Sequence, residues 1–208
     1  MKKMTIAVAI VLFFIVIIMN FKEQIKAFVY TVVTQDMFVS VDDDSFDPGP
    51  SNGSRISTIN AIYQNQRINT LDSFTGEKGT ILIASRSFDW CPYCMRQLIQ
   101  LQQKKALFDD AGLSLVAMTY DPPALQQAFV TKHSIDIPVL SDVNGTTFKA
   151  LGILNQEYAV GDDRYGLPYP GMIILNTDGV VVGKLFVEAY SARVDAQSSL
   201  AYALSKLD

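Results

Sequence analysis

The two cysteines of this 208-residue chain, Cys91 and Cys94, are the only ones it has, and they stand three positions apart. An apolar run, Thr80–Ala84, precedes them, and a run of helical character, Met95–Gln100, follows them directly. This order places the first sulfur at a helix N-terminus, where unpaired backbone N–H groups and the helix dipole favour the thiolate. The second sulfur lies one turn further on, close enough to attack a mixed disulfide formed at the first. The spacing therefore indicates redox chemistry.

Two other uses of a cysteine pair fit this sequence less well. A zinc site needs four ligands, and the chain offers a single histidine, His133, near the end of a predicted helix. We expect His133 to have a surface or helix-end role. A purely structural disulfide would close a very short loop here and add little stability.

The composition excludes two classes of partner. A hydrophobic content of 49% fits a globular domain with an apolar core, while the net charge of −4 argues against nucleic acid, because phosphate binding needs a basic surface. No Gly-rich phosphate loop is present, so no nucleotide is expected. We predict no cofactor in the chain itself, and electrons must then come from another dithiol protein.

The N-terminus predicts a membrane anchor. Lys2 and Lys3 precede the uncharged run Met4–Phe21, which as a helix would be about 27 Å long and would span a hydrocarbon core. A cleaved signal peptide would end in a small-x-small site, whereas Ile18–Lys22 has large residues there. Residues 1–21 are therefore predicted to be a single-pass anchor in the lipid membrane. The two lysines favour a cytoplasmic N-terminus, so the rest of the chain is expected outside the cytoplasm.

Residues 22–54 are predicted to connect this anchor to the domain. Apolar residues from Phe21 to Val32 recur at helical spacing, which fits a helix that continues outside the membrane, a helix along its surface, or a simple stalk. The segment Val41–Ser54 then contains four acids, two prolines and two glycines. This composition is typical of a flexible acidic linker.

Residues 55–208 are predicted to form one domain in which strands and helices alternate. The expected strands are residues 80–84, 113–119, 137–140, 172–175 and 180–187. The expected helices are residues 91–108, a helix capped by Asp121 with Pro122 at its first position, a short helix after the Asn144–Gly145 turn, and a closing helix with Leu200 and Leu207. The turn Asn176–Gly179 joins the last two strands into a hairpin. This order predicts an α/β sandwich with a mixed sheet.

Several short motifs follow one another over the same residues. They are Arg86–Cys94 (RSFDWCPYC), Thr119–Asp121, Ile137–Asp142, Leu151–Asn155, Pro168–Gly171 and Asn176–Gly179. Together they resemble the thioredoxin-like superfamily and, within it, the peroxiredoxin-like redoxins of the alkyl-hydroperoxide-reductase/thiol-specific-antioxidant group. The resemblance implies a thioredoxin-like sandwich with a mixed central sheet flanked by helices. It also implies an antioxidant oxidoreductase that acts on disulfides or hydroperoxides.

The resemblance gives roles to the residues around the cysteines. Cys91 is expected to be the nucleophile and Cys94 the resolving thiol, the two forming a redox-active disulfide. Trp90, Pro92 and Tyr93 are expected to form a substrate-binding rim, and the Pro92-Tyr93 dipeptide is typical of glutaredoxins.

A further substrate-binding residue is expected at Pro170. In thioredoxin-like proteins a cis-proline precedes the strand beside the cysteines, and the run Pro170–Leu175 resembles that position. The alternatives are a trans proline that starts a strand, or Pro168 as the cis residue.

One motif of the family is absent. Typical peroxiredoxins have P-x-x-x-T/S-x-x-C at the peroxidatic cysteine, and counting back from Cys91 gives Phe88 and Ala84 at the hydroxyl and proline positions. We therefore expect disulfide exchange first, with weak peroxidase activity at best, and hydroperoxide reduction by Cys91 as the alternative. A non-catalytic, membrane-tethered binding module is the alternative of another class.

Two arginines near the cysteines in sequence are further candidates. Arg86 and Arg96 either lower the pKa of the thiolate or bind a peroxide oxygen, or they are solvated.

Overall fold

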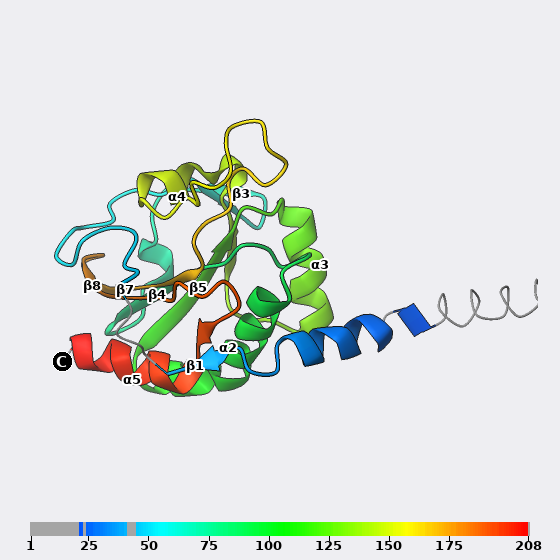
Figure 1. The fold of residues 1–208 in the computed structure, drawn as a ribbon. Coiled ribbons are helices and arrows are strands. Elements are labelled where there is room, and N and C mark those ends of the chain that lie inside the picture. The colour runs from blue at the N-terminus through cyan, green and yellow to red at the C-terminus, as the bar shows by residue number, and fades with distance from the viewer. Residues whose placement is uncertain (1–20, 23, 41–44, 208) are drawn as a thin grey trace, which may run out of the picture. The chain divides into compact units, whose positions relative to one another are not determined.

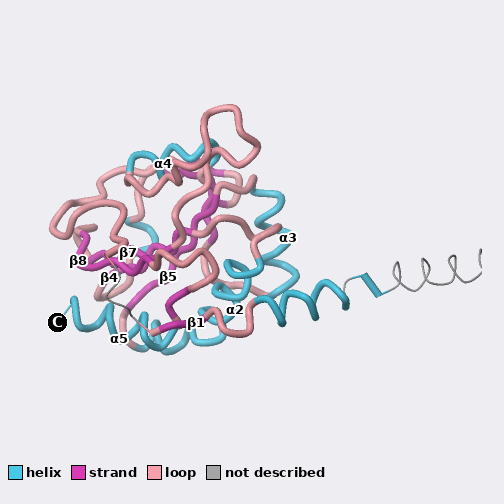
Figure 2. Tube along the Cα trace, viewed as in Figure 1, coloured by secondary structure: helices cyan, strands magenta, loops and turns pink. Residues whose placement is uncertain are grey.

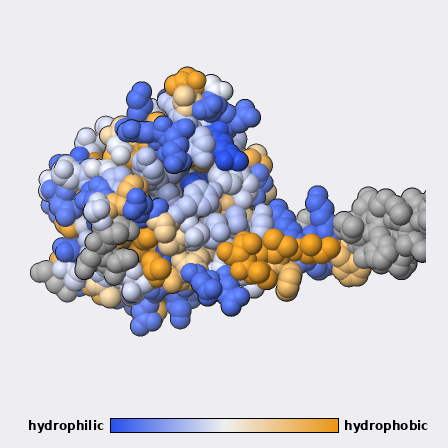
Figure 3. All heavy atoms as spheres, viewed as in Figure 1, coloured by the Kyte–Doolittle hydropathy of each residue, from blue (hydrophilic) through white to orange (hydrophobic). Residues whose placement is uncertain are grey.

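The computed structural model describes residues 21–22, 24–40 and 45–207, and it divides the chain into two compact units, Met1–Asp36 and Met37–Asp208. Residues 24–33 of the first unit are helical, and several of their apolar side chains are exposed, among them Phe28 and Val32. Figure 3 shows apolar atoms, in orange, gathered along this segment. Of the helices described, none is long and apolar enough to cross a bilayer. The predicted anchor, residues 1–21, lies outside the described residues except for Phe21 and stays a prediction.

The second unit is built on a seven-stranded mixed sheet with the order β3-β2-β6-β5-β4-β7-β8 (Figure 1). Its strands are β2 Ala61–Tyr63, β3 Gln66–Ile68, β4 Gly79–Ala84, β5 Leu113–Thr119, β6 Val139–Ser141, β7 Gly171–Asn176 and β8 Val181–Phe186. The central strands β4, β5 and β6 run parallel, whereas β7 is antiparallel to both β4 and β8. The predicted mixed sheet and closing hairpin are confirmed.

Helices lie on both sides of this sheet (Figure 2). They are α2 Pro92–Asp110, α3 Pro123–His133, α4 Thr146–Ala150 and α5 Ala196–Leu207, together with the 3-10 turns η1 Asp72–Phe74 and η2 Val143–Gly145. The helix α3 begins one residue later than predicted, because Pro122 is its N-cap. The predicted cap, Asp121, uses its carboxylate at the cysteine site instead, as described below.

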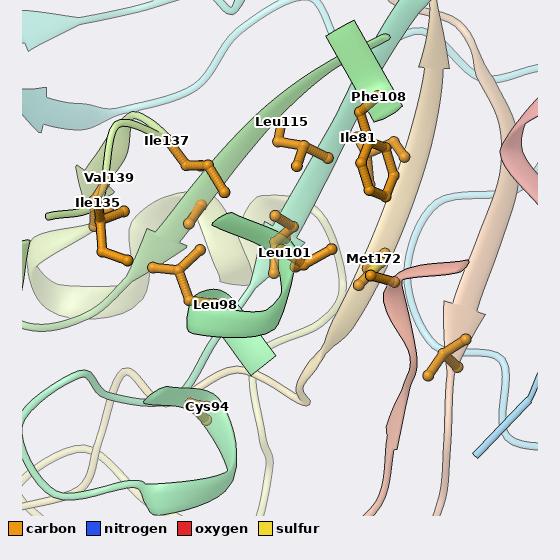
Figure 4. Packing of buried hydrophobic residues seen from close by; sticks show 14 of the residues in the cluster. Ile81, Cys94, Leu98, Leu101, Phe108, Leu115, Ile135, Ile137, Val139 and Met172 are labelled. Carbon is orange, nitrogen blue, oxygen red and sulfur yellow. The ribbon is translucent and has the colours of Figure 1, made fainter. Parts of the chain in front are cut away.

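Strand β4 is apolar on both faces, as expected for a central strand of a covered parallel sheet. Ile81 and Ile83 belong to one core cluster, together with Leu98 and Leu101 of α2 (Figure 4). The intervening residue Leu82 belongs to the cluster on the other face. This period of two buries all three isoleucine and leucine side chains of the strand completely. The sheet therefore provides a rigid support for the segment that leaves β4.

A second, two-stranded sheet was not predicted. It pairs β1, Phe38–Val39, in parallel with β9, Arg193–Val194. The side chain of Gln97 in α2 donates a hydrogen bond to the Val194 carbonyl, with 3.5 Å between the nitrogen and the oxygen. These contacts hold the chain before α5 against the first turns of α2.

The compact unit begins earlier than the predicted domain boundary at residue 55. Lys184 of β8 forms an ion pair of 2.9 Å with Asp47, and the Gly53 N–H donates a hydrogen bond of 2.8 Å to the Val181 carbonyl. The Phe46 ring meets the Tyr169 ring edge to face. Residues 45–54, which composition suggested as flexible linker, are thus packed on the domain by contacts with residues far along the chain.

Candidate active site

The two cysteines lie where the chain leaves β4 and enters α2. Cys91 is the N-cap of α2, and its Sγ accepts a hydrogen bond from the Cys94 N–H at 3.3 Å. Pro92 occupies the first helical position, where a missing N–H costs nothing. Cys91 and Cys94 form a disulfide with their Cα atoms 5.4 Å apart. Both are buried, with 1% and 0% of their surface exposed.

Arg86 contacts the first sulfur. It lies two residues after the end of β4. Its Nη2 donates to Cys91 Sγ at 3.5 Å and to the Tyr190 carbonyl at 3.2 Å. The Tyr190 ring lies over the guanidinium, 3.5 Å from its carbon to the ring centre. The side chain is 2% exposed, and this burial lowers the pKa of Arg86. Arg86 is thus buried against the Cys91 sulfur and not solvated, and its role toward a thiolate or a peroxide stays a prediction.

Arg193 contacts the second sulfur in the same way. Its Nη2 donates to Cys94 Sγ at 3.4 Å, and its Nη1 donates to the carbonyls of Tyr190 and Ala192. It is 2% exposed, and burial together with the nearby charge of Arg86 lowers its pKa to about 9. Arg193 could not be recognised as a site residue from the sequence, because it lies 99 positions from Cys94 and no motif surrounds it.

The two guanidiniums have no carboxylate partner in the part of the chain that the structure describes. Besides burial, the titratable groups that influence the pKa of Arg86 are three tyrosines, Tyr190, Tyr158 and Tyr93. Those that influence the pKa of Arg193 are Arg86, Tyr190 and Tyr93. The Nε atoms of both arginines are buried and make no hydrogen bond to described residues. Two positive charges therefore face the sulfur pair, an arrangement that stabilises a thiolate at either position.

A buried carboxylate holds the segment between β4 and Cys91. Asp121 accepts hydrogen bonds from Ser87 Oγ at 2.8 Å, from the Phe88 N–H at 2.7 Å and from Thr119 Oγ1 at 3.0 Å. Ser87 Oγ in turn accepts from the Trp90 N–H. Burial raises the pKa of Asp121. Ser87 thus orders the backbone before the nucleophile, and the structure shows no contact of its hydroxyl with either sulfur.

The predicted aromatic rim is half-buried beside the cysteines. Trp90 Nε1 donates to Tyr120 Oη at 3.2 Å, and the Tyr93 ring meets the Tyr190 ring edge to face, with 6.2 Å between centres. Pro92 is also half-buried. The structure brings these residues to the surface around Cys91, and their substrate-binding role stays a prediction.

The prediction of a cis-proline at Pro170 is wrong. The described residues contain no cis peptide bond, so neither Pro170 nor Pro168 provides one. Pro170 directly precedes Gly171, whose strand pairs with Ala84 at the end of β4. A trans proline fits this position because its missing N–H is not needed before the strand begins. Pro170 therefore lies next to the segment that leads to Cys91, and its role toward a substrate stays a prediction.

Two other candidate residues lie near aromatic rings. Arg96 has its guanidinium 5.8 Å from the Phe38 ring centre. His133 is exposed in the last turn of α3 with its ring against Phe129, the helix-end position that we expected. Among the described residues, no three His, Cys, Asp or Glu side chains come together as a metal site would need.

Comparison with known proteins identifies the family. The profile of the AhpC/TSA family matches residues 53–184, more than half of the chain, and the chain belongs to this family. This confirms the resemblance seen in the motifs. Together with the Cys91–Cys94 pair, it makes the protein a thiol-dependent oxidoreductase.

Individual relatives are distant. Alkyl hydroperoxide reductase E of Mycobacterium tuberculosis is 25% identical over 118 residues, which are 57% of this chain and 73% of that protein. Peroxidoxin BcpB of Mycobacterium tuberculosis superposes with a TM-score of 0.61 at 19% identity, over 75% of this chain and 95% of that one. Reduced Prx3 of Vibrio vulnificus, solved in complex with hydrogen peroxide, gives 0.63 at 18% identity over 74% and 99%. These structures confirm the predicted thioredoxin-like fold.

Proposed function

We propose that the protein is a thiol-dependent peroxidase in which Cys91 attacks a hydroperoxide and Cys94 resolves the product. One observation supports this most: Cys91 Sγ, at the N-cap of α2, accepts hydrogen bonds from both the Cys94 N–H and Arg86. The relatives named as alkyl hydroperoxide reductase and the solved complex with hydrogen peroxide support the same substrate class. This ranking reverses the one drawn from sequence, which placed disulfide exchange first.

The reaction would proceed in two steps. The Cys91 thiolate attacks one peroxide oxygen, so that an S–O bond forms while the O–O bond breaks, and the departing oxygen takes a proton and leaves as alcohol or water. Cys91 is then a sulfenic acid. The Cys94 thiol attacks its sulfur, the S–S bond forms and water leaves. A dithiol donor returns the two electrons by reducing the disulfide.

Arg86 would replace the hydroxyl that the family motif supplies. The motif position is Phe88, which is buried, and the Ser87 hydroxyl is engaged by Asp121 and Trp90. The Arg86 Nε–H has no hydrogen-bond partner among the described residues. A fixed donor beside the nucleophile can stabilise the negative charge that develops on the departing oxygen.

The burial of the sulfurs favours a small oxidant. Cys91 is 1% exposed, so a protein disulfide would need a larger opening of the site than a hydroperoxide does. The second candidate function, thiol–disulfide exchange, is favoured by the C-x-x-C spacing and by the half-exposed aromatic rings of Trp90 and Tyr93. Both functions use the same nucleophile, and they differ in which oxidant reacts faster.

Matched cysteine variants test the assignment. The reduced full-length protein is mixed with hydrogen peroxide, and its products are trapped with a reagent specific for sulfenic acids. We expect Cys91→Ser to lose the fast reaction, and Cys94→Ser to keep it but to stop at the trapped sulfenic acid. A Cys91→Ser variant that still consumed peroxide at the wild-type rate would show that Cys91 is not the nucleophile. Failure of the wild type to react would favour disulfide exchange or a non-catalytic binding module.

We also propose that the chain is anchored in a membrane with the domain outside the cytoplasm. The support is the uncharged run Met4–Phe21 behind Lys2 and Lys3, followed by a helical segment with exposed apolar side chains. After expression in bacteria, the full-length protein should stay in the membrane pellet through alkaline carbonate washing, and external protease should reach Met37–Asp208 once the outer envelope is opened. Recovery of the intact chain in the soluble fraction would contradict the anchor.

A further inference from the structure

Each of the two active-site sulfurs accepts a hydrogen bond from a different buried arginine. Arg86 donates to Cys91 at 3.5 Å and Arg193 donates to Cys94 at 3.4 Å, although the two arginines come from distant parts of the sequence. We propose that this pair makes the dithiol the favoured state, so that the Cys91–Cys94 disulfide is strongly oxidising and accepts electrons even from weakly reducing dithiol proteins. The inference deepens the proposed function, on which its biological use rests, by naming the class of electron donor.

The oxidised state leaves both cations poorly compensated. A disulfide has no charge, and neither guanidinium has a carboxylate partner among the described residues. Each is 2% exposed, and each keeps a buried Nε–H without a hydrogen bond to the described part of the chain. Their polar contacts outside the sulfurs are backbone carbonyls, with the Tyr190 ring over Arg86. Buried charge with so few partners is costly.

Reduction supplies the missing negative charge. When the S–S bond breaks, one of the two cysteines can remain a thiolate between the guanidiniums, and hydrogen bonds from a cation to an anion are stronger than those to a neutral sulfur. The Cys94 N–H at the start of α2 already donates to Cys91 Sγ and would stabilise the same anion. The lowered pKa of Arg193, about 9, is consistent with a cation that lacks this charge in the oxidised state.

The electron transfer balances with a dithiol protein as donor. One donor thiolate attacks a sulfur of the disulfide, the S–S bond breaks and a mixed disulfide forms. The second donor sulfur then attacks the first, and the donor leaves as a disulfide. The donor loses two electrons and two protons; one proton stays on the reduced pair and the other goes to solvent. If the reduced Cys91–Cys94 pair is stabilised as a thiolate, the exchange equilibrium shifts toward reduced protein and oxidised donor.

Equilibration with glutathione measures how strongly the dithiol is favoured over the Cys91–Cys94 disulfide, and it needs no peroxide. The full-length protein is brought to equilibrium in mixtures of reduced and oxidised glutathione, free thiols are alkylated, and the reduced fraction is counted by mass. We expect Arg86→Gln and Arg193→Gln each to lower the equilibrium constant for reduction roughly tenfold or more, the effect of one charge-assisted hydrogen bond. Tenfold corresponds to about 30 mV. Arg67→Gln removes the same charge from an exposed position on β3 and should change the constant less than twofold.

Thermal unfolding gives a second readout on the wild type alone. Because the redox equilibrium and folding are linked, an oxidising disulfide must destabilise the fold, and the reduced protein should melt at the higher temperature. If the arginines only supported the fold, the reduced protein would not melt at a higher temperature than the oxidised protein. A higher melting temperature for the oxidised protein, or glutathione constants equal in wild type, Arg86→Gln and Arg193→Gln, would overturn the proposal. Slow peroxide reduction with an oxidising disulfide would instead remove only the peroxidase assignment.

Discussion

Arg193 is a buried cation whose ionisation is coupled to folding. Its pKa is lowered to about 9 in the folded protein, mainly by burial, while the unfolded chain keeps the ordinary, higher value. Above pH 9 the unfolded state therefore binds more protons than the folded state, and the contribution of this residue to stability rises with pH. Below pH 9 both states are protonated and the cost of burial is fully present.

This coupling predicts a pH-dependent difference between two proteins. The free energy of unfolding of the oxidised wild type, minus that of Arg193→Gln, should rise from pH 9 to pH 10 by up to about 1.4 kcal/mol per pH unit. Urea unfolding at several pH values measures it. The free energy of unfolding of the wild type, minus that of Arg67→Gln, should not change with pH in this range, because the Arg67 side chain is exposed. A flat difference for Arg193→Gln as well would show that its guanidinium does not titrate in this range.

Asp121 is the residue that orders the approach to the nucleophile. Replacing it with alanine leaves the Ser87 hydroxyl and the Phe88 N–H without their buried acceptor. We expect Asp121→Ala to lower the free energy of unfolding by about 2–4 kcal/mol, and to slow the oxidation of Cys91 as the segment loosens. Asp110→Ala, at the exposed end of α2, should cost less than about 0.5 kcal/mol. Equal urea midpoints for the two variants would contradict this role.

At the scale of elements, α2 fixes both cysteines because one side of the helix is buried in the core. Leu98 is 1% exposed, two turns along the helix from Cys91, and it belongs to the cluster that includes Cys94. Leu98→Ala should lower the free energy of unfolding by about 2–5 kcal/mol through the cavity it leaves. Leu107→Ala offers the control, because Leu107 is 48% exposed and its truncation should cost less than about 0.5 kcal/mol. Similar losses in both variants would mean that α2 is not anchored through this side.

The elements that could be predicted from sequence are those with a long local pattern. The strand 113–119 was predicted at its observed bounds, and α2 to within two residues, because their apolar spacing and flanking residues are local signals. Strands β1 and β9 have two residues each and exist only through their pairing, so no local pattern marks them. Arg193 was missed for that reason.

Asp121 shows how a correct local signal can still give the wrong element boundary. An aspartate before a proline is typical of a helix cap, yet Ser87 and the Phe88 N–H, more than thirty positions earlier in the chain, bind its carboxylate instead. The cysteine pair itself was predictable, since its spacing and its position between strand and helix are both local. The charges around it come from distant segments and required the tertiary structure.

At the scale of the whole molecule, the fold brings two segments that are distant in the sequence to one site. The strand β4 delivers Arg86 and Cys91, while the chain between β8 and α5 returns Tyr190 and Arg193 to the same sulfurs. Strand β9 pairs with β1, and β1 lies before residue 53, where the match to the family profile begins. The segment near residue 38 therefore helps to place Arg193, which makes it part of the redox domain.

The rate at which hydrogen peroxide oxidises the reduced full-length protein tests the central claim most directly. Trp90, the only tryptophan, adjoins Cys91 and reports the reaction by its fluorescence in stopped flow. If Arg86 stabilises the departing oxygen, the wild type should react roughly a hundredfold or more faster than free cysteine at the same pH, and Arg86→Gln should lose most of this advantage. A wild-type rate equal to that of free cysteine, or a rate unchanged in Arg86→Gln, would contradict the account.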